Sequence, residues 1–322
     1  MGAVRDFVVR HYRHFNAAIL VDAARAWEKH LDKGGKMFLT MGGAMSTAEI
    51  GLVLAELIRR DKVHGLCVTG ANIEEDVFNL VAHESYKRVP NFRELTPRED
   101  KALLEQGLNR VTDTCIPEDE AMRKIEHHML DLWKAAEAKG ERRAPYEYFY
   151  QLLRSKVLEP DYDIDPRGSW LLAASDKNLP IYVPGWEDST LGNMFTAAAM
   201  QKKLGGFGCM KFGAEQMAML IDWYRETDKN HRLGFFQIGG GISGDYPICV
   251  VPLIRQDMKQ DVRTWGYFCQ ISEAKTSYGS YSGAPPSEKI TWGKLDVDTP
   301  RFMIESDATI VFPLIAAFLL DM

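Results

Sequence analysis

"MFLTMGGAMSTAEIGLVLAELIRRDKVHGLCVTGANIEEDVFNLVAH", residues 37–83, contains an apolar run, a turn of small residues and a segment of helical spacing, and then repeats that order. The apolar runs are residues 37–41 and 65–70, and each reads as a buried strand. Ser46 and Glu49 have the spacing of a capping box, which predicts that the first helix begins there. Strand, turn and helix twice in succession predict parallel strands joined by right-handed crossovers.

The same alternation extends over most of the chain. We expect further strands at 179–185, 233–241, 265–271 and 301–306, and helices at 16–31, 190–204, 213–226, from about Pro247, and at the carboxy terminus. Residues 84–150 are polar and charge-rich and include a probable long helix that ends at Gly140. The sequence therefore predicts one α/β domain over residues 1–322, with a doubly wound, mostly parallel Rossmann-like sheet and a polar helical insertion at about 84–150.

Composition limits the class of protein. With 322 residues, 46% hydrophobic and 26% charged, the chain can bury a sizeable core. The net charge of −6 disfavours nonspecific binding to nucleic acid. The longest nearly uncharged stretch, 309–320, is too short to span a bilayer, and the amino terminus lacks the apolar region of a secretory signal. We expect a cytoplasmic protein without a membrane segment.

Cysteine and histidine usage argues against a metal site. The chain has five cysteines, an odd number, and they are scattered without a C-x-x-C pair. His127 and His128 are adjacent, so they point in different directions on a helix. We therefore expect neither a disulfide framework nor a bound metal.

Acidic residues accumulate after the predicted strands. In doubly wound sheets, ligands bind beyond the carboxyl ends of the strands, where several loops converge. The acids that follow strands are Glu74, Glu75, Asp76, Asp188, Asp245, Glu273, Glu288 and Asp307. An anionic cleft suits a cationic amine, although acids at 74–76 are also favoured by the dipole of a helix without any function.

The segment "GGGISG" matches the pattern G-x-G-x-x-G at Gly239, Gly241 and Gly244, after a strand and before a helix. This pattern predicts close approach of the backbone to a nucleotide, while a tight strand-to-helix turn is an equal alternative. No G-x-S-x-G elbow occurs in the sequence, so a hydrolase triad has little support.

The segment "SEKITWGKLDVD", residues 287–298, contains Lys294, which is either a nucleophile or a solvated surface charge. A lysine attacks carbon only as the neutral amine, which burial beside an aromatic ring favours. Trp292 could provide that ring, and Gly293 could allow a close approach of substrate. The alternative is a solvated surface charge, since most lysines are exposed.

Several segments in order resemble the deoxyhypusine synthase family, including its bacterial deoxyhypusine synthase-like members and the homospermidine synthases. The most specific is "SGAPPSEKITWGKLDVD", which is similar to the family's S-G-A-x-P-x-E-x-x-x-W-G-K segment. "SDATIVFPL", "TGANIEED", "EDSTLGNM" and "IGGG" resemble four further family segments. The similarity runs from about residue 36 to 320.

The resemblance implies an NAD-dependent transfer of an aminobutyl group from a polyamine such as spermidine. In that reaction a lysine captures a butylimine, an acceptor amine displaces it, and the retained cofactor reduces the product. Lys294 matches the family nucleophile. The acceptor would be a small amine or a protein lysine, and the family also implies a homotetramer with sites at subunit interfaces.

Matching this chain to the family segments residue by residue gives two further groups of candidate site residues. Those that would bind the amine substrate are Glu74, Asn193, Asp245, Gly279, Ser280, Glu288 and Trp292. Those that would hold NAD are Ser46, Thr47, Thr69, Gly70, Ala71, Glu75, Asp188, Gly239, Gly240, Ala274, Ser282, Asp307 and Ala308.

The chain departs from the family pattern at positions that would contact the amine substrate. Asp245 stands at a histidine position, Asn193 at an aspartate position, and Tyr278 and Tyr281 where aspartates are usual. These changes leave the donor and acceptor amines open. The alternatives are a homospermidine synthase with putrescine as acceptor, a simple NAD-linked amine dehydrogenase, and a noncatalytic paralogue that binds an amine or a partner protein.

Overall fold

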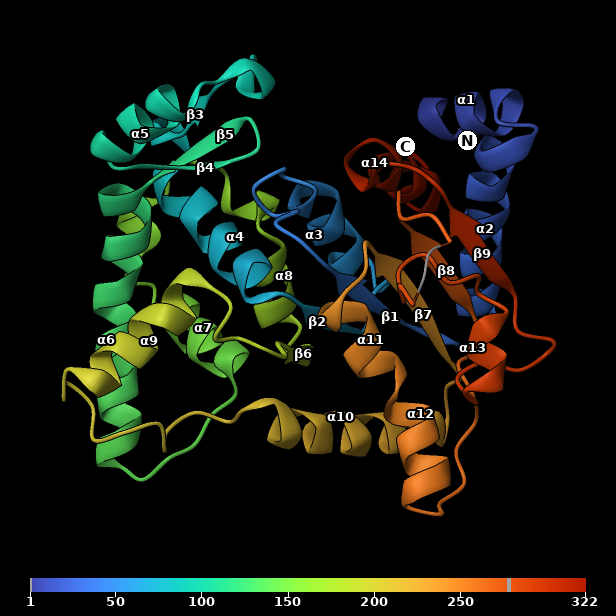
Figure 1. The fold of residues 1–322 in the computed structure, drawn as a ribbon. Coiled ribbons are helices and arrows are strands. Elements are labelled where there is room, and N and C mark those ends of the chain that lie inside the picture. Colours follow the sequence, from blue (N-terminus) through green and yellow to red (C-terminus); the bar gives the residue numbers. More distant parts are fainter. Residues whose placement is uncertain (1, 277–278) are drawn as a thin grey trace.

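The computed structural model describes residues 2–276 and 279–322 and has an α/β fold built on a parallel sheet (Figure 1). In the described part of the chain the main sheet has six strands in the order β6-β2-β1-β7-β8-β9, and every neighbouring pair is parallel. Its strands are β1 Lys36–Met41, β2 Gly65–Val68, β6 Ile181–Tyr182, β7 Leu233–Ile238, β8 Phe268–Ile271 and β9 Arg301–Ile304. The predicted doubly wound fold class is confirmed.

The α-helices alternate with these strands along most of the chain. Their bounds are α1 Ala3–His11, α2 Phe15–Asp32, α3 Gly51–Arg59, α4 Gly70–Ala82, α5 Pro97–Glu105, α6 Lys124–Ala138, α7 Pro145–Arg154, α8 Trp170–Asp176, α9 Thr190–Met200, α10 Gly213–Asp228, α11 Ile242–Ile248, α12 Val250–Pro252, α13 Glu288–Thr291 and α14 Ala308–Leu320.

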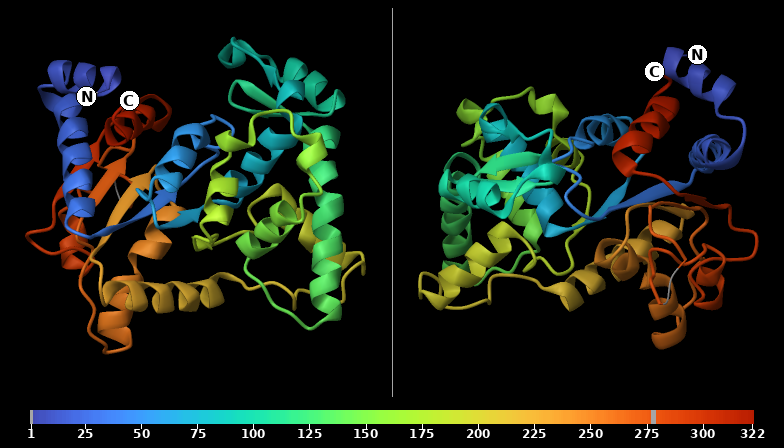
Figure 2. Two further views of the ribbon diagram at one scale, coloured as in Figure 1. Left: turned by 180° about the vertical axis from the view of Figure 1, so that it is seen from behind. Right: turned by 45° about the horizontal axis from the view of Figure 1, so that its top comes forward.

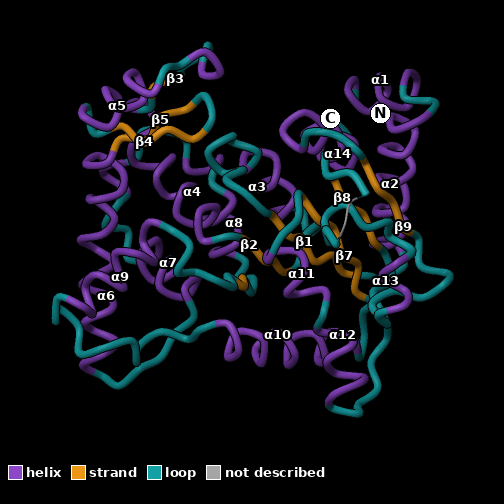
Figure 3. Tube along the Cα trace, viewed as in Figure 1, coloured by secondary structure: helices purple, strands orange, loops and turns teal. Residues whose placement is uncertain are grey.

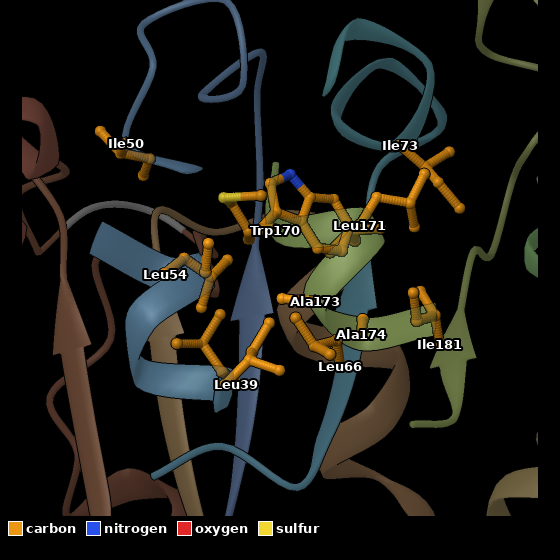
Figure 4. Close-up of a cluster of buried hydrophobic side chains, with 14 of the residues drawn as sticks. Leu39, Ile50, Leu54, Leu66, Ile73, Trp170, Leu171, Ala173, Ala174 and Ile181 are labelled. Carbon is orange, nitrogen blue, oxygen red and sulfur yellow. The ribbon is translucent and has the colours of Figure 1, made fainter. Parts of the chain in front are cut away.

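Both faces of the sheet are buried, as the near-continuous apolar strands require. Successive side chains of a strand point to opposite faces. Leu39 of β1 therefore packs with Leu54 of α3 and Trp170 of α8 in one core cluster, whereas its neighbour Phe38 packs in another with Tyr224 of α10. Figure 4 shows part of the first cluster, and the turned views in Figure 2 show helices on either side of the sheet.

The segment 84–150 contains a second, antiparallel sheet that the sequence did not lead us to expect. Its strands are β3 Lys87–Arg88, β5 Thr114–Pro117 and β4 Leu108–Val111, in that spatial order (Figure 3). The strands have only two to four residues, which is too short for an alternation of apolar and polar residues to be recognised. The long helix was expected, and α6 ends before Gly140, whose φ of +66° suits glycine. Trp133 of α6 is fully buried in the main core.

Two predicted helix starts are wrong. Ser46 does not cap α3, because its hydroxyl donates to the carbonyl of Asn72 (2.7 Å) and α3 begins only at Gly51. The helix expected from about Pro247 begins at Ile242, directly after Gly241, and Pro247 lies inside it. The contact of Ser46 with the distant residue Asn72 explains the later start of α3, and the turn at Gly241 explains the earlier start of α11.

The two ends of the described chain lie together. The backbone N–H of Val4 in α1 donates to the carbonyl of Met322 (3.0 Å), and α1 packs on α14. Within residues 2–276 and 279–322, each helix is either too short or too polar to cross a bilayer.

Candidate functional site

Two pockets lie beyond the carboxyl ends of the main strands, where a doubly wound sheet is expected to bind ligands. We call them the lysine pocket and the glycine pocket. The lysine pocket has a volume of about 330 Å³ and is lined by Asp245, Cys249, Thr276, Gly279, Ser280, Tyr281, Ala284, Glu288, Lys289, Trp292 and Lys294. The glycine pocket has a volume of about 210 Å³ and is lined by Gly42, Gly43, Met45, Ile238, Gly239, Ile271, Ser272, Glu273, Ser306, Asp307 and Ala308.

Lys294 is buried, with 6% of its surface exposed, so the surface-charge alternative is wrong. Its Nζ lies 3.4 Å from Asp245 Oδ1, 5.3 Å from the centre of the Tyr281 ring and 5.7 Å from that of Trp292. This arrangement combines an ion pair with two aromatic walls. Lys294 can attack carbon only as the neutral amine.

The backbone around Lys294 explains why a glycine precedes it. The chain leaves α13 through Gly293, whose φ of +69° is unfavourable for other residues. The N–H of Lys294 then donates to the carbonyl of Lys289 (3.1 Å), and its carbonyl accepts from the N–H of Trp265 (3.2 Å). The lysine is therefore fixed on both sides of its own peptide unit.

Tyr281 forms an uncharged wall of the lysine pocket. Burial raises the pKa of its phenol well above the usual value, and its hydroxyl donates to Gln237 Oε1 (3.1 Å). Tyr281 therefore presents a ring to Lys294 rather than the carboxylate usual at this position in the family. Tyr278, the other tyrosine at such a position, lies outside the described residues.

Most of the residues predicted to bind the amine line the lysine pocket. Asp245 comes from α11, Gly279 and Ser280 from the loop after β8, and Glu288 from α13. Trp292 is 62% exposed, so it can form only the outer rim. The pocket thus has a half-exposed carboxylate beside Lys294 and a second, exposed carboxylate at its edge.

Glu74 and Asn193 do not line the lysine pocket in this chain. Glu74 is buried on α4, where its two oxygens accept the N–H groups of Thr190 and Leu191 at the start of α9 (both 2.8 Å). Burial raises the pKa of Glu74 to about 7. Asn193 donates from Nδ2 to the carbonyls of Glu187 (2.9 Å) and Ser189 (2.7 Å). Within one chain, both side chains are used to hold α9.

The residues predicted for the cofactor divide into two sets. Gly239, Asp307 and Ala308 line the glycine pocket. Gly239 has a φ of +75°, which favours glycine, and Asp307 Oδ1 accepts the N–H of Thr309 (2.7 Å) as the cap of α14. Because β7 and β9 end at this pocket, the topology of the sheet brings the three together.

Gly240 and Ser282 connect the two pockets. The N–H of Gly241 donates to Ser282 Oγ (3.3 Å), and a Cβ added at Gly240 would overlap that hydroxyl. Nε2 of Gln270 donates to the carbonyls of Gly239 (3.1 Å) and Ser282 (3.0 Å). The glycine turn and the loop after β8 are therefore held against each other. On that loop, the N–H of Ala274 donates to Ser272 Oγ (3.1 Å).

The remaining predicted cofactor residues lie outside the lining of the glycine pocket. Thr69 caps α4 and donates from its hydroxyl to the carbonyl of Gly43 (2.7 Å), so it positions that pocket's edge. Gly70 packs closely, since an added Cβ would lie 2.5 Å from Ser189 Cβ. Ala71 is half-buried on α4, and Asp188 is exposed before α9.

Ser46, Thr47 and Glu75 form an internal network instead. The Ser46 hydroxyl donates to Asn72 and accepts the indole N–H of Trp170 (3.0 Å), so its single donor is used, and the side chain is buried. Glu75 Oε2 accepts the N–H of Thr47 (3.1 Å), and burial raises the pKa of Glu75 to about 8. The prediction that Ser46 holds the cofactor is not supported by its contacts in this chain.

The sequence analysis missed one buried amine. Lys289 is 2% exposed and lines the lysine pocket, with its Nζ 4.8 Å from the centre of the Tyr281 ring. Its helix, α13, has only four residues, so no periodic pattern could mark it as facing inward. The sequence analysis also missed Cys249, Thr276 and Ala284. Only the folding of the loops brings these three residues to the pocket. In the residues that the structure describes, no group of three or more His, Cys, Asp or Glu side chains could hold a metal.

The fold and these pockets define a doubly wound α/β protein with a buried lysine beside a glycine-lined pocket at the carboxyl edge of its sheet. A family model for deoxyhypusine synthase matches residues 8–319, and the chain belongs to that family. The resemblance seen in the sequence is thus confirmed.

Individual relatives are distant. "Probable deoxyhypusine synthase 2" of Methanosarcina acetivorans is 26% identical over 305 residues, covering 94% of this chain and 82% of the relative. "Deoxyhypusine synthase-like protein" of a Nostoc species is 26% identical over 324 residues, covering 99% and 82%. A crystal structure described as a "putative deoxyhypusine synthase" from Entamoeba histolytica has a TM-score of 0.58 at 14% identity, covering 96% of this chain and 89% of the other. That structure supports the fold alone.

Proposed function

We propose that this protein is an NAD-dependent aminoalkyltransferase that acts on a polyamine such as spermidine through an imine on Lys294. The observation that carries the proposal is the buried position of Lys294 between Asp245 and the rings of Tyr281 and Trp292, in a family whose name denotes such a transfer. Membership of the family supports a transferase of this type.

The lysine pocket suits a flexible chain with a cationic end. Asp245 and Glu288 offer carboxylates that can bind ammonium groups, and Tyr281 and Trp292 offer ring faces that attract cations and pack against methylene groups. A volume of about 330 Å³ is at the lower end of the range for small-molecule sites. The pocket therefore favours a slender aliphatic amine.

Lys294 forms and breaks the covalent bond. Its neutral Nζ adds to the imine carbon of the oxidised donor, the bond from that carbon to the leaving amine breaks, and diaminopropane departs with the proton. An acceptor amine then adds to the same carbon, and Lys294 leaves as the free amine. Asp245, at 3.4 Å, can hold the Lys294 ammonium before the attack and a substrate ammonium after it.

The residues of the glycine pocket suit one part of a nicotinamide dinucleotide, because its volume of about 210 Å³ is too small for the whole molecule. Gly239 allows close approach of the ligand to the backbone, and the carboxylates of Asp307 and Glu273 can accept hydrogen bonds from ribose hydroxyls. Bound there, NAD would accept a hydride from the carbon beside the donor amine and return it to the product. Gln270 and Ser282, which tie the glycine turn to the loop of the lysine pocket, would keep the two ligands in a fixed relation.

Measuring the amounts of diaminopropane, NADH and modified acceptor tests this function. Purified protein with NAD and spermidine should release about one diaminopropane per active site without acceptor and further diaminopropane only in proportion to the acceptor supplied, with no stoichiometric release of NADH. Stoichiometric NADH in solution would indicate an amine dehydrogenase instead. Spermidine that stays intact in the presence of NAD and every acceptor would indicate a noncatalytic paralogue. Comparing putrescine with candidate acceptor proteins identifies which amine gains the aminobutyl group.

A further inference from the structure

Lys289 is a buried amine that the proposed reaction does not use. It is 2% exposed, and among the described residues its Nζ has no hydrogen-bond partner. A buried ammonium without a partner is costly, because no group replaces the water that it has lost. A neutral amine in the same place costs far less, so the geometry favours the neutral form.

The surroundings of Lys289 are mostly apolar. Its Nζ lies 4.9 Å from the centre of the Phe268 ring on β8 and 4.8 Å from that of the Tyr281 ring. The titratable and charged groups that face it are Glu288 of its own helix, Asp245 of α11, Cys249 directly after α11, the neutral phenol of Tyr281, and Lys294. Of the carboxylates, Glu288 is exposed, and Asp245 already forms an ion pair with Lys294.

The two lysines therefore share one pocket but have different partners. Both amines lie near the same ring, at 4.8 and 5.3 Å from the centre of Tyr281. Lys294 has a carboxylate at 3.4 Å, whereas no carboxylate in the described part of the chain lies at ion-pair distance from Lys289. Burial first, and then the charge of Lys294, lower the pKa of Lys289 to about 8. A substantial fraction of Lys289 is then neutral at mildly alkaline pH.

We propose that Lys289 is a second imine-forming amine of the lysine pocket, which captures small aliphatic aldehydes or imines that enter it. A neutral, desolvated lysine in an apolar pocket meets the physical requirement for this chemistry. The inference does not depend on the proposed transferase activity, because it needs neither NAD nor a polyamine.

The capture is a simple condensation. The Nζ lone pair attacks the carbonyl carbon, a carbon–nitrogen bond forms, and the carbonyl oxygen leaves as water with the two protons that the amine gives up. With an imine in place of the aldehyde, an amine leaves instead of water. Added cyanoborohydride supplies the hydride that converts the product into a stable secondary amine.

The test is reductive alkylation with propanal and cyanoborohydride over a pH series, followed by peptide mapping with fragmentation that distinguishes Lys289 from Lys294. We expect alkylation of Lys289 with a midpoint near pH 8, well below the ~10.4 of an unperturbed lysine, and Lys139, which is exposed, serves as the internal reference. The Lys294→Met variant should keep this alkylation and raise its midpoint, because a like charge has been removed. Circular dichroism shows whether that variant is folded.

Two outcomes would overturn the inference. One is alkylation confined to Lys294 and the surface lysines of the wild-type protein. The other is a Lys289 midpoint equal to that of Lys139. Because the assay contains neither NAD nor spermidine, these outcomes are independent of whether the proposed transferase activity is found.

Discussion

Lys294 and Lys289 show how much the surroundings of a residue decide its chemistry. The sequence singled out Lys294 by its motif, and the structure buries it beside two aromatic rings as that prediction required. Yet Lys294 is paired with Asp245, while the Nζ of Lys289 has neither a hydrogen bond nor an ion pair among the described residues. Burial thus lowers the pKa of the amine that the motif did not mark.

Replacing Lys289 with methionine should stabilise the protein at neutral pH. The lowered pKa means that the unfolded chain binds more protons than the folded one between about pH 8 and the ordinary value of 10.5. The wild-type protein therefore carries a penalty that is complete below pH 8 and vanishes above pH 10.5. A difference of about 2.5 pKa units corresponds to on the order of 3 kcal/mol.

Urea unfolding at pH 7 and at pH 10.5 measures this effect. Lys289→Met should have the larger free energy of unfolding at pH 7, and the difference from wild type should shrink at the higher pH. The exposed Lys139→Met change is the control, for which we expect no difference beyond about 0.5 kcal/mol. A Lys289→Met variant that is less stable than wild type at pH 7 would contradict the desolvated, unpartnered position of this amine.

Among the elements, the glycine turn after β7 governs both pockets. Gly239 lines the glycine pocket, and Gly240 leaves room for Ser282 on the loop that lines the lysine pocket. The motif in the sequence was equally consistent with a simple tight turn. The positive φ angles of Gly239 and Gly241 show that a tight turn is present, and its position shows that the turn also borders a pocket.

Substituting Gly240 with alanine should therefore separate the two loops. The added methyl group overlaps Ser282 Oγ, and overpacking of this kind costs roughly 1–3 kcal/mol. Thermal and urea unfolding should show this loss. Gly208→Ala is a matched control, because Gly208 is exposed and no atom lies within 4 Å of an added Cβ. Equal stability of the two variants would show that the loops yield without cost.

Elements with a strong apolar pattern could be predicted from the sequence, and those decided by distant contacts could not. Each strand of the main sheet was expected from its apolar run. Such a run arises because neighbouring residues such as Leu39 and Phe38 are buried on opposite faces of the sheet. The strands of the second sheet have only two to four residues and are too short to give a recognisable apolar pattern. The start of α3 was misplaced because Ser46 bonds to Asn72 of α4, a contact between residues 26 apart. The lysine pocket was largely predictable because a single motif supplies Glu288, Trp292 and Lys294.

At the scale of the whole molecule, the predicted site residues lie in separate places on one chain. Asn193 is exposed on α9 and does not line the lysine pocket. The family resemblance implies a homotetramer with sites at subunit interfaces, and we propose that a second chain brings its Asn193 to the lysine pocket of the first. Isologous contacts between two copies would complete two sites at once.

Mixing two inactive variants tests this arrangement. Lys294→Ala and Asn193→Ala should each lose transfer activity, and co-expression of the two should restore part of it, since a mixed pair has one site with both residues intact. Light scattering should give a mass close to four chains. Co-assembled variants that remain inactive would contradict a shared site.

The central claim is that Lys294 carries the aminobutyl group, and trapping that intermediate tests it most directly. The protein is incubated with NAD and labelled spermidine, borohydride is added, and the label is located by peptide mapping with fragmentation. We predict that the label lies on Lys294 in the wild-type protein and requires NAD. The absence of label from Lys294 in folded protein that cleaves spermidine, or label found on Lys289 alone, would contradict the claim.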